Sequence, residues 1–97
     1  MKFKSIIERV PVDSMGNVEK DCYAVWGKSF TYFSPKFTFT NGDEALAYVK
    51  MLSKEKIGNE PVKEVYMNEY KAGYCDAFAF THCMYDRGNF NENFIWE

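Results

Sequence analysis

The segment "NGDEALAYVKMLSKEKIGNEP" (residues 41–61) carries the clearest periodic pattern in the chain. Asn41 is a favourable helix N-cap, and Glu44, three residues later, completes a capping-box pattern. Apolar residues then follow with the spacing i, i+3, i+4 and i+7 of one helix face: Ala45, Tyr48, Val49 and Leu52. The pattern predicts an amphipathic helix that ends near Gly58, and Pro61 prevents its restart.

Before this helix, the sequence predicts a β-hairpin. Asp, Ser, Gly and Asn gather in "VDSMGNV" (residues 12–18), and these residue types are typical of a turn. We expect the first strand at residues 5–12, a short segment with several β-branched side chains. Residues 3–10 also fit a helical apolar stripe that Pro11 would end, so a helix is the alternative there.

Strand patterns continue between this turn and the helix. Residues 18–33 alternate and are rich in aromatic and β-branched side chains, and Gly27 is expected to mark a bend or bulge that divides them. Beyond Pro35, the short segment "KFTFT" (residues 36–40) places Phe37 and Phe39 on one face of a further strand.

Two more strands are predicted after the helix. "VKEVYMNEY" (residues 62–70) is followed by a turn at "KAG" (71–73) and by residues 74–85. With a period of two, the last segment places large side chains on one face, namely Tyr74, Phe78, Phe80, His82 and Met84, and small ones on the other, namely Cys75, Ala77, Ala79, Thr81 and Cys83. This separation is typical of a strand in a sheet that packs against a helix, although Ala and Met leave a helix as the alternative.

These elements predict a single α+β domain that spans residues 1–97. Its sheet is antiparallel, has four to five strands, and carries one helix packed on a face. The expected order is strand, strand, a third short strand, helix, strand, strand.

His82 and the three cysteines raise the question of a metal or nucleophile site. Cys75 and Cys83 would lie about 26 Å apart in a strand or about 12 Å apart in a helix, too far to bind one metal ion. His82 and Cys83 point to opposite faces of a strand, and Cys22 meets His82 only if the fold brings them together. The sequence carries no known catalytic signature, so we predict no catalytic residue, no metal and no cofactor.

The charge balance and the cysteine count restrict the partners and the compartment. With 12 Lys and Arg against 14 Asp and Glu, the net charge is −2, and the basic excess of a nucleic-acid-binding protein is missing. Three cysteines cannot all pair within one chain, and no apolar run has the length of a signal peptide or a membrane span. We therefore expect reduced thiols, a cytoplasmic location, and neither nucleic acid nor membrane as partner.

Aromatic residues make up 19% of the chain, more than a small core is expected to bury. The segment "DRGNFNENFIWE" (residues 86–97) combines a turn with a cluster of aromatic side chains. Because Trp, Tyr, Phe and Arg dominate protein interfaces, we predict a partner-binding set from this segment and from residues 62–70: Arg87, Phe90, Phe94, Trp96, Tyr66 and Tyr70. Docking of the segment on its own domain and formation of a homo-oligomer are the alternatives.

In length, aromatic content and lack of motifs, the chain resembles small accessory proteins of bacteriophages and other mobile elements, including anti-CRISPR and other anti-defence proteins. That resemblance implies a protein that binds and blocks a larger host protein. The sequence therefore predicts a non-enzymatic inhibitor or adaptor. The alternatives are a small-ligand or nucleotide-binding protein with an aromatic pocket, and a small enzyme that uses His82.

Overall fold

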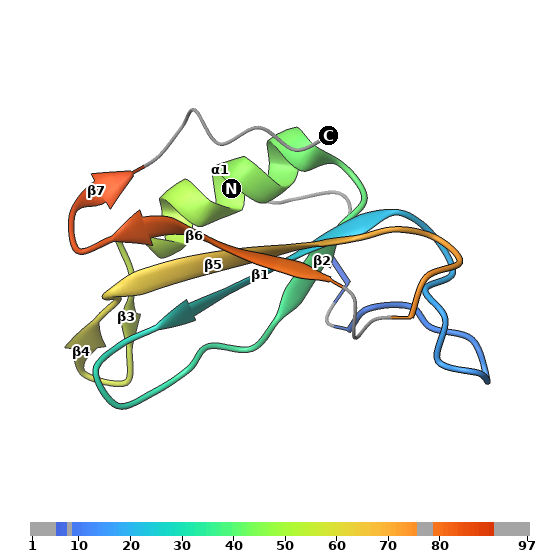
Figure 1. Ribbon diagram of the computed structural model, residues 1–97. Helices are drawn as coiled ribbons and strands as arrows, with labels where there is room; N and C mark the ends of the chain where they lie inside the picture. The colour runs from blue at the N-terminus through green and yellow to red at the C-terminus, as the bar shows by residue number, and fades with distance from the viewer. Residues whose placement is uncertain (1–5, 8, 76–78, 91–97) are drawn as a thin grey trace.

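The computed structural model of the protein describes residues 6, 7, 9–75 and 79–90 (Figure 1). Within this part of the chain the side chains of residues 80, 89 and 90 are not described. The elements are, in chain order, β1 (Cys22–Lys28), β2 (Phe37–Phe39), α1 (Gly42–Leu52), β3 (Lys56–Ile57), β4 (Glu60–Pro61), β5 (Glu64–Tyr70), β6 (Phe80–Asp86) and β7 (Asn89–Phe90).

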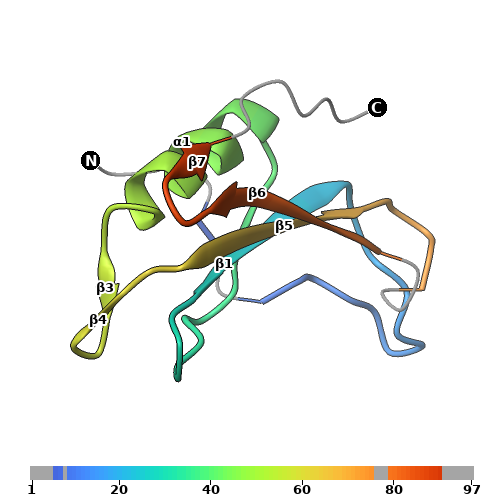
Figure 2. The ribbon, with the colours of Figure 1, turned by 60° about the vertical axis from the view of Figure 1, so that its left-hand side comes forward.

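The strands form a five-stranded sheet in the order β2-β1-β5-β6-β7 and a separate hairpin of β3 and β4. All of the pairings are antiparallel. Figures 1 and 2 show α1 lying across one face of the sheet. Residues 9–18, which we call the N-terminal segment, pass along the other face. The predicted α+β class, with one helix packed on a face of an antiparallel sheet, is confirmed.

The main core lies between α1 and the central strands. Its fully buried members include Val25 of β1, Met67 of β5 and Met84 of β6, which pack with Val49 on the helix. Gly27 lies within this contact, because a Cβ atom there would come within 3.2 Å of Leu52 Cδ2. The predicted bend at Gly27 is wrong, since β1 runs through it without a break; the missing side chain instead lets the helix approach the sheet closely.

The predicted N-cap of α1 is confirmed, but the predicted capping box and helix end are not: no hydrogen bond joins Glu44 to the Asn41 N–H group, and Oε2 of Glu44 is buried without a hydrogen-bond partner among the described residues. Oδ1 of Asn41 accepts hydrogen bonds from the backbone N–H groups of Asp43 (2.8 Å) and Glu44 (3.2 Å), as an N-cap does. The helix ends at Leu52 rather than near Gly58. Gly58 has a φ of 63° and instead makes the tight turn between β3 and β4, where a left-handed residue is required.

The predicted first strand at residues 5–12 is not formed in the part of it that the structure describes, and neither is its helical alternative. The segment makes isolated bridges instead, from Ile7 to Thr38 and from Val12 to Val18. Pro11 lacks a backbone N–H group and interrupts any longer ladder. The turn at residues 12–18 is confirmed by the hydrogen bond from the Asp13 N–H to the Asn17 carbonyl (2.9 Å).

Of the strand predicted at residues 74–85, residues 80–85 are confirmed as part of β6, so the helical alternative is wrong there. Residues 74, 75 and 79 lie outside the strand, with Cys75 in an isolated bridge to Asn17, and residues 76–78 lie outside the described residues. His82 pairs with Met67 of β5, and directly paired residues share a face, so His82 lies on the helix-facing side. Thr81 and Cys83 lie on the opposite side. The predicted turn at 71–73 is confirmed by the left-handed Gly73, with a φ of 86°.

Candidate functional site

The structure does not bring His82 and Cys22 together. Cys22 lies on the face of β1 opposite to the helix, in a small cluster with Val18 and Tyr70, whereas His82 lies on the helix-facing side of β6. Strand β5 separates the two strands. Burial raises the pKa of the Cys22 thiol to about 11, so it is protonated at neutral pH and is a poor nucleophile.

Cys83 is exposed on the same face as Cys22, but its surroundings also disfavour a thiolate. Partial burial, and then the negative charges of Glu64 and Asp86, raise its pKa above the ordinary value. Among the described residues, no group of three His, Cys, Asp or Glu side chains is placed to hold a metal ion. Cys22 and Cys83 are therefore poor nucleophiles, and the described residues form no metal-binding group of this kind.

The structure separates the residues of the predicted partner-binding set. Phe94 and Trp96 lie outside the described residues, and of Phe90 only the backbone, in β7, is described. Tyr70 is only 6% exposed and packs in the cluster that the N-terminal segment covers, so its ring offers no free contact surface.

Tyr66 and Arg87 are more accessible but lie apart. Tyr66 is half-buried and stacks on Trp26, with ring centroids 5.6 Å apart, and the ammonium of Lys36 lies 4.7 Å from the Trp26 ring centroid. Arg87 is exposed in the turn between β6 and β7, where residues 86–89 were predicted to turn. It is the one predicted partner-binding residue whose described side chain lies at a well-defined exposed site.

The most exposed aromatic cluster lies in a loop that the sequence interpretation treated as strand. Residues 29–35 connect β1 to β2, and three large side chains of this loop face solvent: Phe30 (60% exposed), Tyr32 (50%) and Phe33 (64%). The signal that could have found the loop is the polar Ser and Thr between these rings, followed by Pro35. Monomeric proteins rarely expose so many neighbouring rings without a use for them.

Ser29 fixes the conformation of this loop from inside. The residue is fully buried, and its Oγ accepts hydrogen bonds from the N–H groups of Tyr32 (2.9 Å) and Thr31 (3.3 Å). Its own N–H donates to the Tyr32 carbonyl at 2.8 Å. The far end of the loop returns to β1, because the Ser34 hydroxyl accepts from the N–H of Gly27 at 2.7 Å.

A second brace joins the loop to the β3–β4 hairpin. One carboxylate oxygen of Glu60 accepts from the Thr31 N–H and the other from the Thr31 hydroxyl, both at 2.9 Å. Hydrogen bonds from Thr31, and secondarily from Ser29, hold the pKa of Glu60 below its ordinary value. The ring of Tyr32 packs directly over Gly58 of the hairpin turn. The loop that carries the exposed rings is therefore held by hydrogen bonds to Ser29 and to Glu60 of the hairpin.

Three cations surround the same rings. Nζ of Lys63 lies 5.0 Å and Cζ of Arg87 lies 5.4 Å from the ring centroid of Phe30, and Nζ of Lys28 lies 5.6 Å from that of Phe33. These are cation–π distances. Backbone hydrogen bonds of 2.8 Å, from the Lys63 N–H to the Lys28 carbonyl and from the Arg87 N–H to the Lys63 carbonyl, align the three chain segments.

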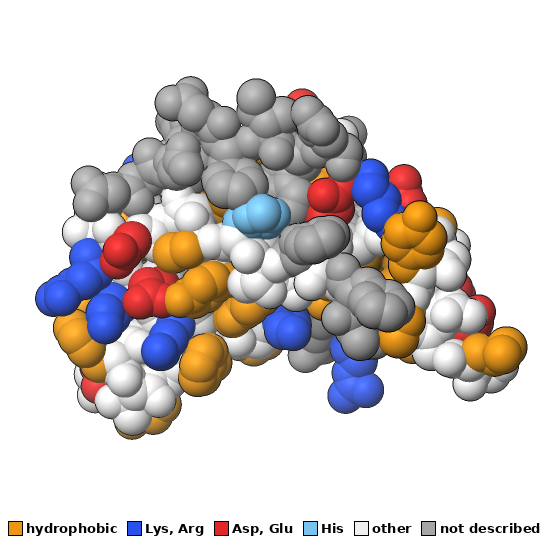
Figure 3. All heavy atoms as spheres, viewed as in Figure 1, with side chains coloured by type: hydrophobic (Ala, Val, Ile, Leu, Met, Phe, Trp, Pro, Cys, Tyr) orange, Lys and Arg blue, Asp and Glu red, His pale blue; other side chains and the backbone are white. Residues whose placement is uncertain are grey.

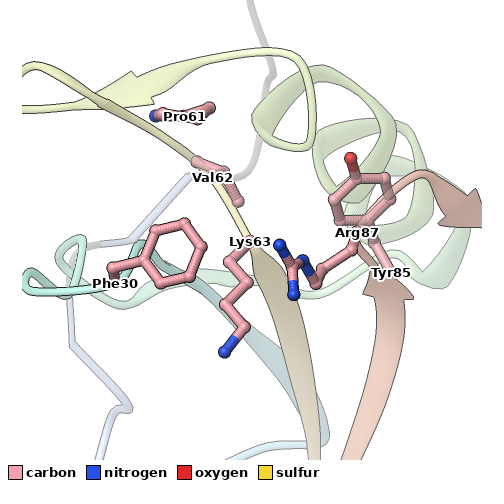
Figure 4. A pocket seen from close by; sticks show the side chains of 6 residues that line it. All are labelled: Phe30, Pro61, Val62, Lys63, Tyr85 and Arg87. Atoms are coloured by element: carbon pink, nitrogen blue, oxygen red, sulfur yellow. The ribbon is translucent and has the colours of Figure 1, made fainter.

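We call the surface made by Phe30, Tyr32, Phe33, Lys63 and Arg87 the aromatic–cationic surface. Figure 3 shows charged and hydrophobic side chains gathered at the end of the molecule that carries the β6–β7 turn and the β3–β4 hairpin. A shallow pocket of about 210 Å³ lies in this surface (Figure 4). It is lined by Phe30, Pro61, Val62, Lys63, Tyr85 and Arg87.

Comparisons with protein-family models, with curated proteins and with solved structures find no match to this chain. Within the part of the chain that the structure describes, no helix has the length and apolar character needed to cross a membrane.

Proposed function

We propose that this chain is a non-enzymatic protein-binding protein that occupies a surface of a larger partner through its aromatic–cationic surface. The observation that carries the proposal is the combination of exposure and rigidity in the loop at residues 29–35. Its rings face solvent while buried Ser29 and the carboxylate of Glu60 hold its backbone.

This combination favours binding for a physical reason. Phe, Tyr and Arg are side chains that contribute strongly to protein interfaces when a partner removes them from water. A loop that is already ordered loses little conformational entropy on binding, so more of the contact energy appears as affinity. The same rings do not add to the core of the free protein, since they are at least half exposed.

The two other candidate functions have weaker support. The pocket in the aromatic–cationic surface has a volume of about 210 Å³, below the roughly 300–1,000 Å³ of sites that enclose small ligands, so this surface is better suited to a side chain than to a whole ligand. An enzyme based on His82 and Cys22 is disfavoured, because the two side chains lie on opposite faces of the sheet. The resemblance to anti-defence proteins adds to the proposal the expectation that binding inhibits the partner.

The test is affinity capture from a lysate of the source cells with three forms of the tagged protein. We expect the wild type to retain one stoichiometric protein, and the double variant Phe30→Ser/Phe33→Ser to lose it by roughly tenfold or more. The matched control is Met15→Ser, which removes an 83% exposed apolar side chain in the turn at the other end of the sheet (Figure 1).

Capture of the partner by the wild type and by the control, but not by the double variant, would support the proposal. If the wild type retains no protein, or if all three forms retain the same one equally, the proposed surface is wrong.

A further inference from the structure

We infer that Lys63 and Arg87 form an anchor for a carboxylate, an aspartate or glutamate side chain of the protein partner, held beside the ring of Phe30. This inference rests on the proposed function and names the chemistry that the partner must present. It predicts an acidic contact segment rather than a neutral or basic one.

The positive charges of this anchor, on Lys63 and Arg87, have no ion-pair partner within the described residues. Lys71, in contrast, is paired with Glu69 at 2.8 Å. Two cations next to one ring repel each other, and a bound anion would relieve that repulsion.

The acidic side chains close to the anchor in the chain, namely Glu60, Glu64 and Asp86, either lie on another face of the sheet or already accept hydrogen bonds. Glu64 pairs with Asp86, next to the pair of Val65 and Tyr85. Because Val65 lies on the helix-facing side, alternation places Glu64 and its partner Asp86 on the opposite face of the sheet. Both oxygens of the Glu60 carboxylate accept hydrogen bonds from Thr31. None of these three described carboxylates forms an ion pair with Lys63 or Arg87.

The shape of the pocket suits one acidic side chain. Figure 4 shows Lys63 and Arg87 next to each other beside Phe30, with Pro61 and Val62 along one side. Pro61 and Val62 give the pocket one apolar side, and the guanidinium of Arg87 can donate two hydrogen bonds to one carboxylate. About 210 Å³ of space is suited to a single side chain.

The backbone conformation of Arg87 is unusual for an arginine. Its φ of 47° lies in the left-handed region, and the adjacent Gly88 has a φ of 102°. Asn, Asp or Gly is the usual residue at such a position in a tight hairpin turn, because a longer side chain is disfavoured there. An arginine at this site indicates a use for its side chain.

The inference is tested by selecting a random twelve-residue peptide library displayed on phage against the immobilised full chain. We expect enriched peptides to share an Asp or Glu next to an apolar residue. A synthetic peptide of the enriched sequence should bind roughly fivefold to tenfold more weakly when that acid is replaced by Gln, as measured by fluorescence anisotropy.

The double variant Lys63→Gln/Arg87→Gln should bind the acidic and the Gln peptides equally. The matched control is Lys20→Gln/Lys54→Gln, which changes the net charge by the same amount at two exposed lysines in other connecting segments. The control should keep the preference for the acidic peptide. This comparison separates a local anchor from a general effect of net charge.

The outcomes distinguish the inference from the proposed function. Peptides that require Phe30 and Phe33 but show no acidic preference would overturn the inference and leave the proposed function standing. No enriched peptide, or peptides that the Phe30→Ser/Phe33→Ser variant still binds, would contradict both. If a phosphoserine peptide binds more than tenfold tighter than the Glu peptide, the anchor recognises a phosphate and the carboxylate assignment is wrong.

Discussion

The core beneath α1 and the loop at residues 29–35 use the same kinds of side chain for opposite purposes. In the core, Val25, Met67 and Phe39 are fully buried, and they stabilise the fold by leaving water. In the loop, Phe30 and Phe33 remain largely exposed, although the backbone that carries them is hydrogen-bonded on two sides. The difference shows that apolar character alone does not bury a side chain. Hydrogen bonds of the loop backbone hold its rings at the surface.

The largest expected effect comes from shortening a core side chain. Met67→Ala should lower the free energy of unfolding by about 2–5 kcal/mol, because Met67 is fully buried between the sheet and α1. Phe33→Ala, which removes a larger but exposed side chain, should change it by less than about 0.5 kcal/mol. Urea denaturation followed by tryptophan fluorescence measures both. An equal loss of unfolding free energy in the two variants would contradict the distinction between the core and the loop at residues 29–35.

The next effect concerns the buried hydroxyl under the loop. Ser29→Ala removes the acceptor for two backbone N–H groups in a fully buried site, and should cost about 1–2 kcal/mol of stability. Hydrogen exchange at the amides of Thr31 and Tyr32 should become faster. Ser14→Ala, at an exposed turn position, is the control and should leave exchange in the loop unchanged. Unaltered exchange in the Ser29→Ala variant would show that the loop does not depend on this brace.

A smaller effect is expected where the helix touches the sheet. Gly27→Ala places a Cβ atom 3.2 Å from Leu52 Cδ2, so the leucine must move and the helix contact loosens. We expect a loss of about 1 kcal/mol, observed as a lower urea midpoint. Combining it with Leu52→Val should recover part of the loss, since the smaller side chain leaves room. An increase in stability on Gly27→Ala alone would contradict the close-approach explanation.

The smallest expected effect is a pH dependence of the stability that the hydrogen bonds between Thr31 and Glu60 contribute. The pKa of Glu60 is lowered in the folded protein by its hydrogen bonds from Thr31, so its stabilising contribution is present above the unfolded value near 4.5. That contribution is lost as the pH falls through the lowered folded pKa. Urea midpoints of the wild type and of Glu60→Gln should therefore differ at pH 7 and converge at acid pH. A difference that is constant with pH would exclude the carboxylate charge as its source.

The parts of the fold that follow from local chemistry could be predicted. The N-cap at Asn41 depends on a side chain that reaches N–H groups two and three residues away, and it is formed as expected. The period-two pattern of residues 80–85 also placed His82 and Met84 on one face of a strand. The end of α1 could not be predicted, because Gly58 is equally suited to a helix terminus and to the hairpin turn that it makes.

The candidate site could be predicted only in part. The sequence of residues 86–89 predicts the turn that carries Arg87. The large number of aromatic side chains predicts that some of them lie outside the core. The residues that surround Arg87 were missed: Phe30 is 57 positions away in the chain and Lys63 is 24 away. Tyr70 was expected to bind a partner, but the N-terminal segment covers it.

The sequence by itself determined which segments are helix, strand or turn wherever the decisive contacts lie within a few residues, and it determined the low net charge and the excess of aromatic rings. Only the tertiary structure decided which rings are buried and which cations lie beside them. Pairing of β1 with β5 and of β5 with β6 brings Lys28, Lys63 and Arg87 into adjacent positions. Such contacts depend on strand order and register, which long-range packing selects and local patterns do not encode.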